Sequence, residues 1–121
     1  MTNDFRMSYF MPPIAPIKDE HGQLVTPPTL IPCCEVSVEQ LFQMITCNEN
    51  LKVLTEQVRN SEDIRTAKAS LLPYVTPCGT FSRRSSKCLI DPSLLTVVDI
   101  DYLTSYQEAV EMRKTLFNDP L

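Results

Sequence analysis

The 121-residue sequence has one histidine, His21, and none of its five cysteines stands in a Cys-x-x-Cys pair. Structural zinc sites need four Cys or His ligands at short spacings, so these shortages argue against a zinc centre. The odd number of cysteines favours reduced, mostly buried thiols in a cytosolic protein. The sequence also lacks an apolar run long enough to span a bilayer and a visible signal peptide. We therefore expect a cytoplasmic location and no membrane partner.

Glycine is almost absent, with two residues, whereas proline occurs ten times. Six of the prolines lie between residues 11 and 32, where they exclude a helix or a central strand. We expect residues 1–35 to form a proline-rich arm, with a short strand over 4–10 and a turn over 19–22. Residues 36–121 form the expected single domain.

Four helices are predicted in this domain from capping patterns and apolar spacing. Ser37 and Gln40 fit a capping box, which starts a helix that ends near Cys47. Further helices are expected over 51–58, from Ser61 to before Pro73, and from Thr104 or Ser105 to about residue 118. We expect their apolar stripes to be core, namely Val38, Leu41, Phe42 and Ile45, then Leu51, Leu54 and Val58, and finally Tyr106, Ala109, Val110, Leu116 and Phe117.

The run over 94–101 is apolar and β-branched and ends in two carboxylates, Asp99 and Asp101. It is typical of a buried strand, in which alternate side chains share a face. Two carboxylates on one face repel each other unless a cation lies between them, and Mg²⁺ or Mn²⁺ suits carboxylate oxygens. The alternative is structural: Asp101 caps a turn and Asp99 pairs with a buried arginine. The element order predicts an α/β or α+β layer with both aspartates at a sheet edge facing a cleft.

Charge is distributed unevenly along the chain. Residues 52–87 carry seven basic and three acidic residues, while the segments on either side each have a net charge of −4. The densest cluster contains Arg83, Arg84 and Lys87, which can bind phosphates or form a solvated turn between strands. Gly79 and Thr80 precede it, and they offer either donors to phosphate or a structural turn.

An ordered combination of these features resembles one family. The sequence is similar to the N-terminal domain of VirE-type (virulence-associated protein E) proteins of bacterial mobile elements, which is related to the archaeo-eukaryotic primase-polymerase superfamily. The resemblance covers roughly residues 36–121. It rests on Lys68, Leu72, Pro73, Thr76, Pro77, Gly79, Thr80, Phe81, Ser82 and Arg84, then 98–101, then Arg113, Leu116, Asp119 and Pro120.

The resemblance implies a primase-polymerase-like fold around an RRM-like sheet and metal-dependent nucleotidyl transfer. Asp99 and Asp101 match the first catalytic motif of that family, with Mg²⁺ or Mn²⁺ as cofactor. DNA and nucleotide triphosphates are the implied partners of the parent protein, which the family gives a possible downstream helicase domain. No histidine follows His21, so the family's serine-histidine motif is missing. We expect a fragment that is inactive alone.

Two other interpretations stay open. The chain is alternatively a non-catalytic module that binds nucleic acid or a partner protein through its basic residues and its arm. A metal-dependent transferase acting on other substrates is the third possibility, although no additional motif supports it.

Overall fold

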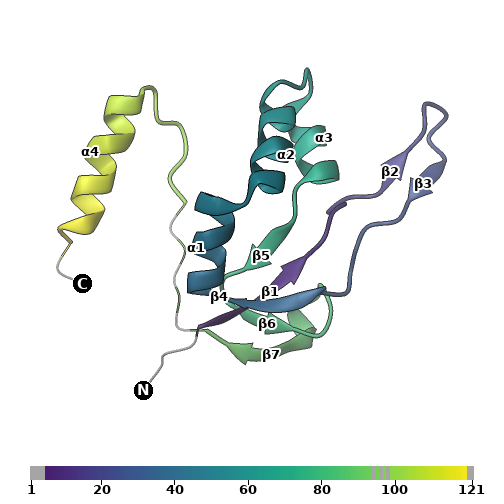
Figure 1. The fold of residues 1–121 in the computed structure, drawn as a ribbon, viewed down its shortest axis with the longest axis horizontal. Coiled ribbons are helices and arrows are strands. Elements are labelled where there is room, and N and C mark those ends of the chain that lie inside the picture. The colour runs from purple at the N-terminus through teal and green to yellow at the C-terminus, as the bar shows by residue number, and fades with distance from the viewer. Residues whose placement is uncertain (1–4, 94, 96, 98, 120–121) are drawn as a thin grey trace.

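The computed structural model describes residues 5–93, 95, 97 and 99–119, and it shows a mixed α+β fold (Figure 1). The strands are β1 (Arg6–Phe10), β2 (Ile17–Lys18), β3 (Leu24–Thr26), β4 (Cys34–Ser37), β5 (Tyr74–Thr76), β6 (Gly79–Phe81) and β7 (Leu89–Pro92). The helices are α1 (Val38–Cys47), α2 (Glu49–Arg59), α3 (Ile64–Leu71) and α4 (Tyr106–Phe117). A single 3-10 turn, Ser86–Cys88, precedes β7.

Three small antiparallel sheets form the β structure. The central one has the strand order β4-β1-β5, and β2-β3 and β6-β7 form two-stranded sheets. Strand β1 lies in the segment predicted to be an arm, yet it is the middle strand of the central sheet. The strand predicted over 4–10 is thus confirmed for residues 6–10, and the chain's first strand organises the domain.

The hydroxyl of Ser8 connects the central sheet to β6. Ser8 is fully buried, and its Oγ accepts a hydrogen bond from the Phe81 N–H at 2.8 Å and donates to the Phe81 carbonyl at 3.3 Å. The Ser8 N–H donates to Thr76 Oγ1 at 3.1 Å, and that hydroxyl donates to the Gly79 carbonyl at 2.8 Å. A buried polar group needs such partners, and here they fasten β6 against β1.

The core is small. Among the described residues, the buried apolar side chains are Met7, Phe10, Val36 and Val58. The ring of Phe10 stacks on that of Tyr74 with their centroids 5.0 Å apart and their planes within 2° of parallel. This pair joins the end of β1 to the start of β5.

Local capping signals set the helix starts. The capping box of Ser37 and Gln40 is present, with Gln40 N–H donating to Ser37 Oγ at 3.1 Å and Ser37 N–H to Gln40 Oε1 at 2.8 Å. Ser105 caps α4 by accepting from the Glu108 N–H. Helix α3 begins later than predicted, because Asp63 and not Ser61 accepts from the Thr66 N–H as its N-cap. The two bonds from Thr66 also lower the pKa of Asp63.

The predicted core stripes are largely wrong. On α1, Phe42 is 63% exposed and Ile45 75%, and on α4 Tyr106 is 86% exposed and Phe117 88%. Figure 1 shows the reason for α4: the helix stands clear of the rest of the described chain. Among the members of the predicted stripes, only Val58 on α2 is buried.

The cysteines also differ from expectation. None forms a disulfide, as predicted, but Cys33, Cys34, Cys47 and Cys78 are exposed and Cys88 is half-buried. The expectation of buried thiols was wrong because a core this small leaves few positions for them.

The proline-rich segment forms a projecting hairpin, β2-β3 (Figure 1). Its turn is the one predicted over 19–22: Asp19 Oδ1 accepts from the backbone N–H groups of His21 and Gln23, both at 2.9 Å, and Gly22 has a φ of 78°. Prolines flank the strands and do not interrupt them, which is how proline is tolerated beside a hairpin.

Replacing Ser8 with alanine should leave both backbone groups of Phe81 without their side-chain partner. Unsatisfied buried groups of this kind cost about 1–3 kcal/mol. We expect Ser8→Ala to lower the free energy of unfolding by that amount in urea denaturation. Ser86→Ala, at an exposed serine, is the control and should change it by less than about 0.5 kcal/mol. Equal effects of the two substitutions would contradict the role of Ser8.

Candidate functional site

Asp99 and Asp101 lie in a segment outside any strand or helix. The predicted strand over 94–101 is therefore wrong for residues 95, 97 and 99–101, while its residues 94, 96 and 98 lie outside the described part of the chain. Both aspartates are exposed and do not lie at a sheet edge. Tyr102, the next residue, has a φ of 64°, in the left-handed region that interrupts an extended chain.

The acidic pair offers a metal ion only part of a coordination shell. Within the described residues, no three His, Cys, Asp or Glu side chains are grouped so that they could hold a metal ion. Two carboxylates with water in the remaining positions are a shell that Mg²⁺ accepts, since it usually keeps several waters. Asp99 and Asp101 are both exposed, but because no strand runs through them, alternation no longer places their carboxylates on one face, and a shared ion stays a prediction.

The basic cluster forms a turn between β6 and β7, as one of the two sequence interpretations predicted. Arg83, Arg84 and Lys87 are all exposed. Arg84 has a structural role, because its N–H donates to the Leu30 carbonyl at 2.7 Å and its Nη1 donates to the Ile14 carbonyl. These contacts fasten both ends of the projecting hairpin to the β6-β7 turn. Arg83 and Lys87 therefore remain the better candidates for phosphate contact.

Gly79 and Thr80 are enclosed within the β6-β7 pair. Thr80 is 2% exposed, and Gly79 has a φ of 152° with the Asp91 carbonyl oxygen 2.2 Å from where a Cβ would lie. Glycine is needed here because the opposite strand approaches too closely for a side chain. Both residues therefore contribute to strand pairing, which agrees with the structural turn that the sequence left open as an alternative. Because both are buried, neither offers a donor to a phosphate from solvent.

A groove of about 650 Å³ lies between α1, α2 and β5, and sequence reasoning did not find it. Its lining combines apolar side chains with charged ones and includes Tyr9, Leu41, Ile45, Lys52, Arg59 and Tyr74. The Tyr74 hydroxyl oxygen is buried without a hydrogen-bond partner among the described residues. The available signal was the apolar stripe of α1, whose Leu41 and Ile45 line the groove, but that stripe was interpreted as core packing alone.

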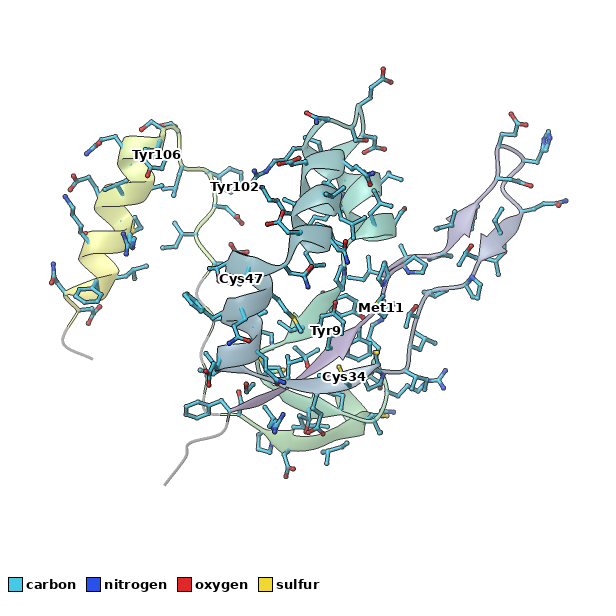
Figure 2. The ribbon with its side chains drawn as sticks, viewed as in Figure 1. Tyr9, Met11, Cys34, Cys47, Tyr102 and Tyr106 are labelled. Atoms are coloured by element: carbon cyan, nitrogen blue, oxygen red, sulfur yellow. The ribbon has the colours of Figure 1, made fainter. Side chains whose placement is uncertain are left out.

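Two further side chains near the aspartates were not predicted as site residues. Tyr102 is 96% exposed and Tyr106 is 86% exposed; Tyr102 lies in the segment that leads into α4, and Tyr106 is the first residue of that helix (Figure 2). Exposed aromatic rings are surfaces on which the bases of a single-stranded nucleic acid can stack. Base stacking is an interaction that the carboxylates of this segment cannot make.

Comparison with known proteins gives one match. Residues 66–121 match the family described as BT4734-like, N-terminal domain. The matched segment is slightly less than half of the chain and includes the basic turn, both aspartates and α4. No curated protein and no solved structure matches the chain. Across the described residues, no helix has the length and apolar character that crossing a membrane requires.

The contacts of Arg84 predict a difference between neighbouring arginines. Arg84→Ala should loosen the base of the hairpin and speed tryptic cleavage at Lys18, because the bond from Nη1 to Ile14 is lost. Arg83→Ala removes the same charge without that bond and should leave cleavage at Lys18 unchanged. Limited proteolysis followed by mass spectrometry measures both rates. Equal rates in the two variants would show that Arg84 does not hold the hairpin.

Proposed function

We propose that this chain is the N-terminal part of a VirE-type, primase-polymerase-like replication protein, and that it binds single-stranded nucleic acid and a divalent metal ion without completing a catalytic centre. The observation that carries the proposal is the exposure, within one short segment, of Asp99 and Asp101 together with Tyr102 and Tyr106. Carboxylates are ligands for the metal ion that nucleotidyl transfer uses, and exposed aromatic rings stack with the bases of a single strand.

The layering of the fold supports this proposal at a coarse level. An antiparallel sheet, β4-β1-β5, lies beside the helices α1, α2 and α3 (Figure 1). In the proposal this sheet belongs to an RRM-like, primase-polymerase-type domain, and the acidic segment follows it in the chain. Five free cysteines suit the reducing cytoplasm, which we propose as the location.

Basic groups for phosphate come from the β6-β7 turn. Arg83 and Lys87 are exposed there, and neither has the fastening role of Arg84. Phosphate contacts by Lys and Arg release counterions, so the affinity falls as salt is added. In the proposal, these two side chains bind the phosphates of the nucleic acid or of a nucleotide triphosphate.

A non-catalytic binding module is the second candidate, and one observation favours it. The described residues supply two carboxylates and no third grouped ligand, so the described part of the chain by itself positions a metal ion weakly. Positioning provides much of the rate of group transfer. A chain of this kind can bind DNA or a partner protein and leave the chemistry to other residues.

Removing Arg83 and Lys87 together should flatten the salt dependence of binding to a single-stranded oligonucleotide. Each phosphate contact contributes about −0.7 to the slope of log affinity against log salt, so the slope should become shallower by about 1.4. Fluorescence anisotropy at several salt concentrations measures it. The double variant Arg113→Ala, Lys114→Ala loses the same charge from exposed positions on α4 and is the control. An equal change of slope in both double variants would show a general effect of net charge and would contradict specific phosphate contacts by Arg83 and Lys87.

Mn²⁺ should broaden the amide signals of residues near Asp99 and Asp101 through its unpaired electrons. The substitution Asp101→Asn removes one carboxylate and should reduce this broadening strongly, since an amide is a poorer ligand for a hard cation. Asp91→Asn, at an exposed position in β7, should leave the broadening as in the unsubstituted protein. The broadening is measured by NMR during titration with Mn²⁺. Undiminished broadening in the Asp101→Asn variant would contradict metal binding by Asp99 and Asp101.

A further inference from the structure

A small depression lies where the hairpin β2-β3 leaves the domain beside helix α3. The Ile14 N–H donates a hydrogen bond to the Ala69 carbonyl at 2.8 Å, which fastens the chain before β2 to the C-terminal half of α3 (Figure 1). Residues 15–18 then continue along the helix, and they share with it a depression of about 330 Å³. The polar side chains that line the depression are Lys18, Arg65, Thr66 and Ser70.

Two cations from distant parts of the sequence meet in this lining. Lys18 belongs to β2, Arg65 belongs to the first turn of α3, and both side chains are exposed to solvent. Among the described residues, no Asp or Glu side chain lines the depression with them. A hollow that carries positive charge without negative charge attracts anions from solution.

The acidic residues close to these cations in the sequence are directed to other partners. Asp19 accepts hydrogen bonds from two backbone N–H groups of the hairpin turn, both at 2.9 Å. Asp63 is the N-cap of α3 and accepts from the Thr66 N–H at 3.2 Å and from Thr66 Oγ1 at 2.6 Å. Glu20 and Glu62 are exposed and, like the two aspartates, do not line the depression.

The two hydroxyl groups leave the recognition of an anion to the cations. Thr66 Oγ1 donates its proton to Asp63, and Ser70 Oγ donates its proton to the Thr66 carbonyl at 2.8 Å. An arginine guanidinium matches two phosphate oxygens with parallel N–H groups, and a lysine ammonium adds a compact point charge. A phosphate monoester carries a charge of about −1.5 to −2 at neutral pH, so it suits two cations better than a singly charged carboxylate does.

We propose that Lys18 and Arg65 bind a terminal phosphate group, the monoester phosphate of a nucleotide or of the 5′ end of a single strand. The volume of the depression lies at the lower end of the range of small-ligand pockets. None of the residues proposed above for metal, base or phosphate contact takes part. The site therefore does not rest on the proposed function, and the two are tested separately.

Titration with adenosine monophosphate, followed through the backbone amide signals by NMR, tests the site in the full 121-residue chain. The nucleotide should shift the signals of Lys18, Arg65 and Ser70, whereas adenosine, which lacks the phosphate, should leave them in place. This comparison uses the unsubstituted protein, so it does not depend on how a variant folds. Equal shifts with adenosine, or no shift with the nucleotide, would overturn the proposal.

The double variant Lys18→Ala, Arg65→Ala should bind adenosine monophosphate at least about tenfold more weakly, because charge-assisted hydrogen bonds to the phosphate are lost. The double variant Arg113→Ala, Lys114→Ala removes the same charge from exposed positions on α4 and should retain the affinity. Arg83→Ala, Lys87→Ala should retain it too, which separates this site from the β6-β7 turn. Unchanged affinity in the first variant, or an equal loss in all three, would overturn the proposal.

An oligonucleotide with a 5′-phosphate, compared with the same oligonucleotide ending in a 5′-hydroxyl, distinguishes the two sources of the phosphate. Tighter binding of the phosphorylated strand, abolished by Lys18→Ala, Arg65→Ala, would support the site and assign it to a strand end. Equal binding of both strands, together with the nucleotide shifts described above, would support the site and assign it to a free nucleotide.

Discussion

The buried hydroxyl of Ser8 is the interaction on which the rest of the domain depends. It lies on the middle strand β1, and its bonds to Phe81 fasten the β6-β7 pair to the central sheet. Directly after β7, the Ser93 N–H donates a hydrogen bond to the Cys78 carbonyl, which precedes β6, at 2.8 Å. The turn that carries Arg83 and Lys87 is therefore held against the central sheet by one serine of the middle strand.

Local chemistry made part of the fold predictable from the sequence. The capping box of Ser37 and Gln40, the Ser105 cap and the turn over 19–22 depend on residues within a few positions of one another, and all three are present. What the pattern could not predict was which apolar faces meet. Phe42 and Phe117 have helical spacing, but spacing does not say whether another element covers the face, and no described element buries either side chain.

The candidate site was likewise predictable from the sequence only in part. The turn around Arg83 was predictable because charge clusters and strand ends are visible in the sequence. The role of Arg84 was not, because its partner Ile14 lies 70 residues away. The strand expected through Asp99 is absent from the described residues around it, since β-branched composition shows only that a segment fits a sheet, and no partner strand pairs with these residues.

We propose that the chain binds nucleic acid and a metal ion but does not complete a nucleotidyl-transfer centre. The most direct test gives the isolated 121-residue chain a primed single-stranded template, labelled nucleotide triphosphates and Mn²⁺, and measures both retention of the template and incorporation of label. We expect retention without incorporation, because two exposed carboxylates would hold a metal ion without positioning the reacting groups. Template-dependent incorporation by this chain alone would contradict it, and so would failure to retain the template by folded protein.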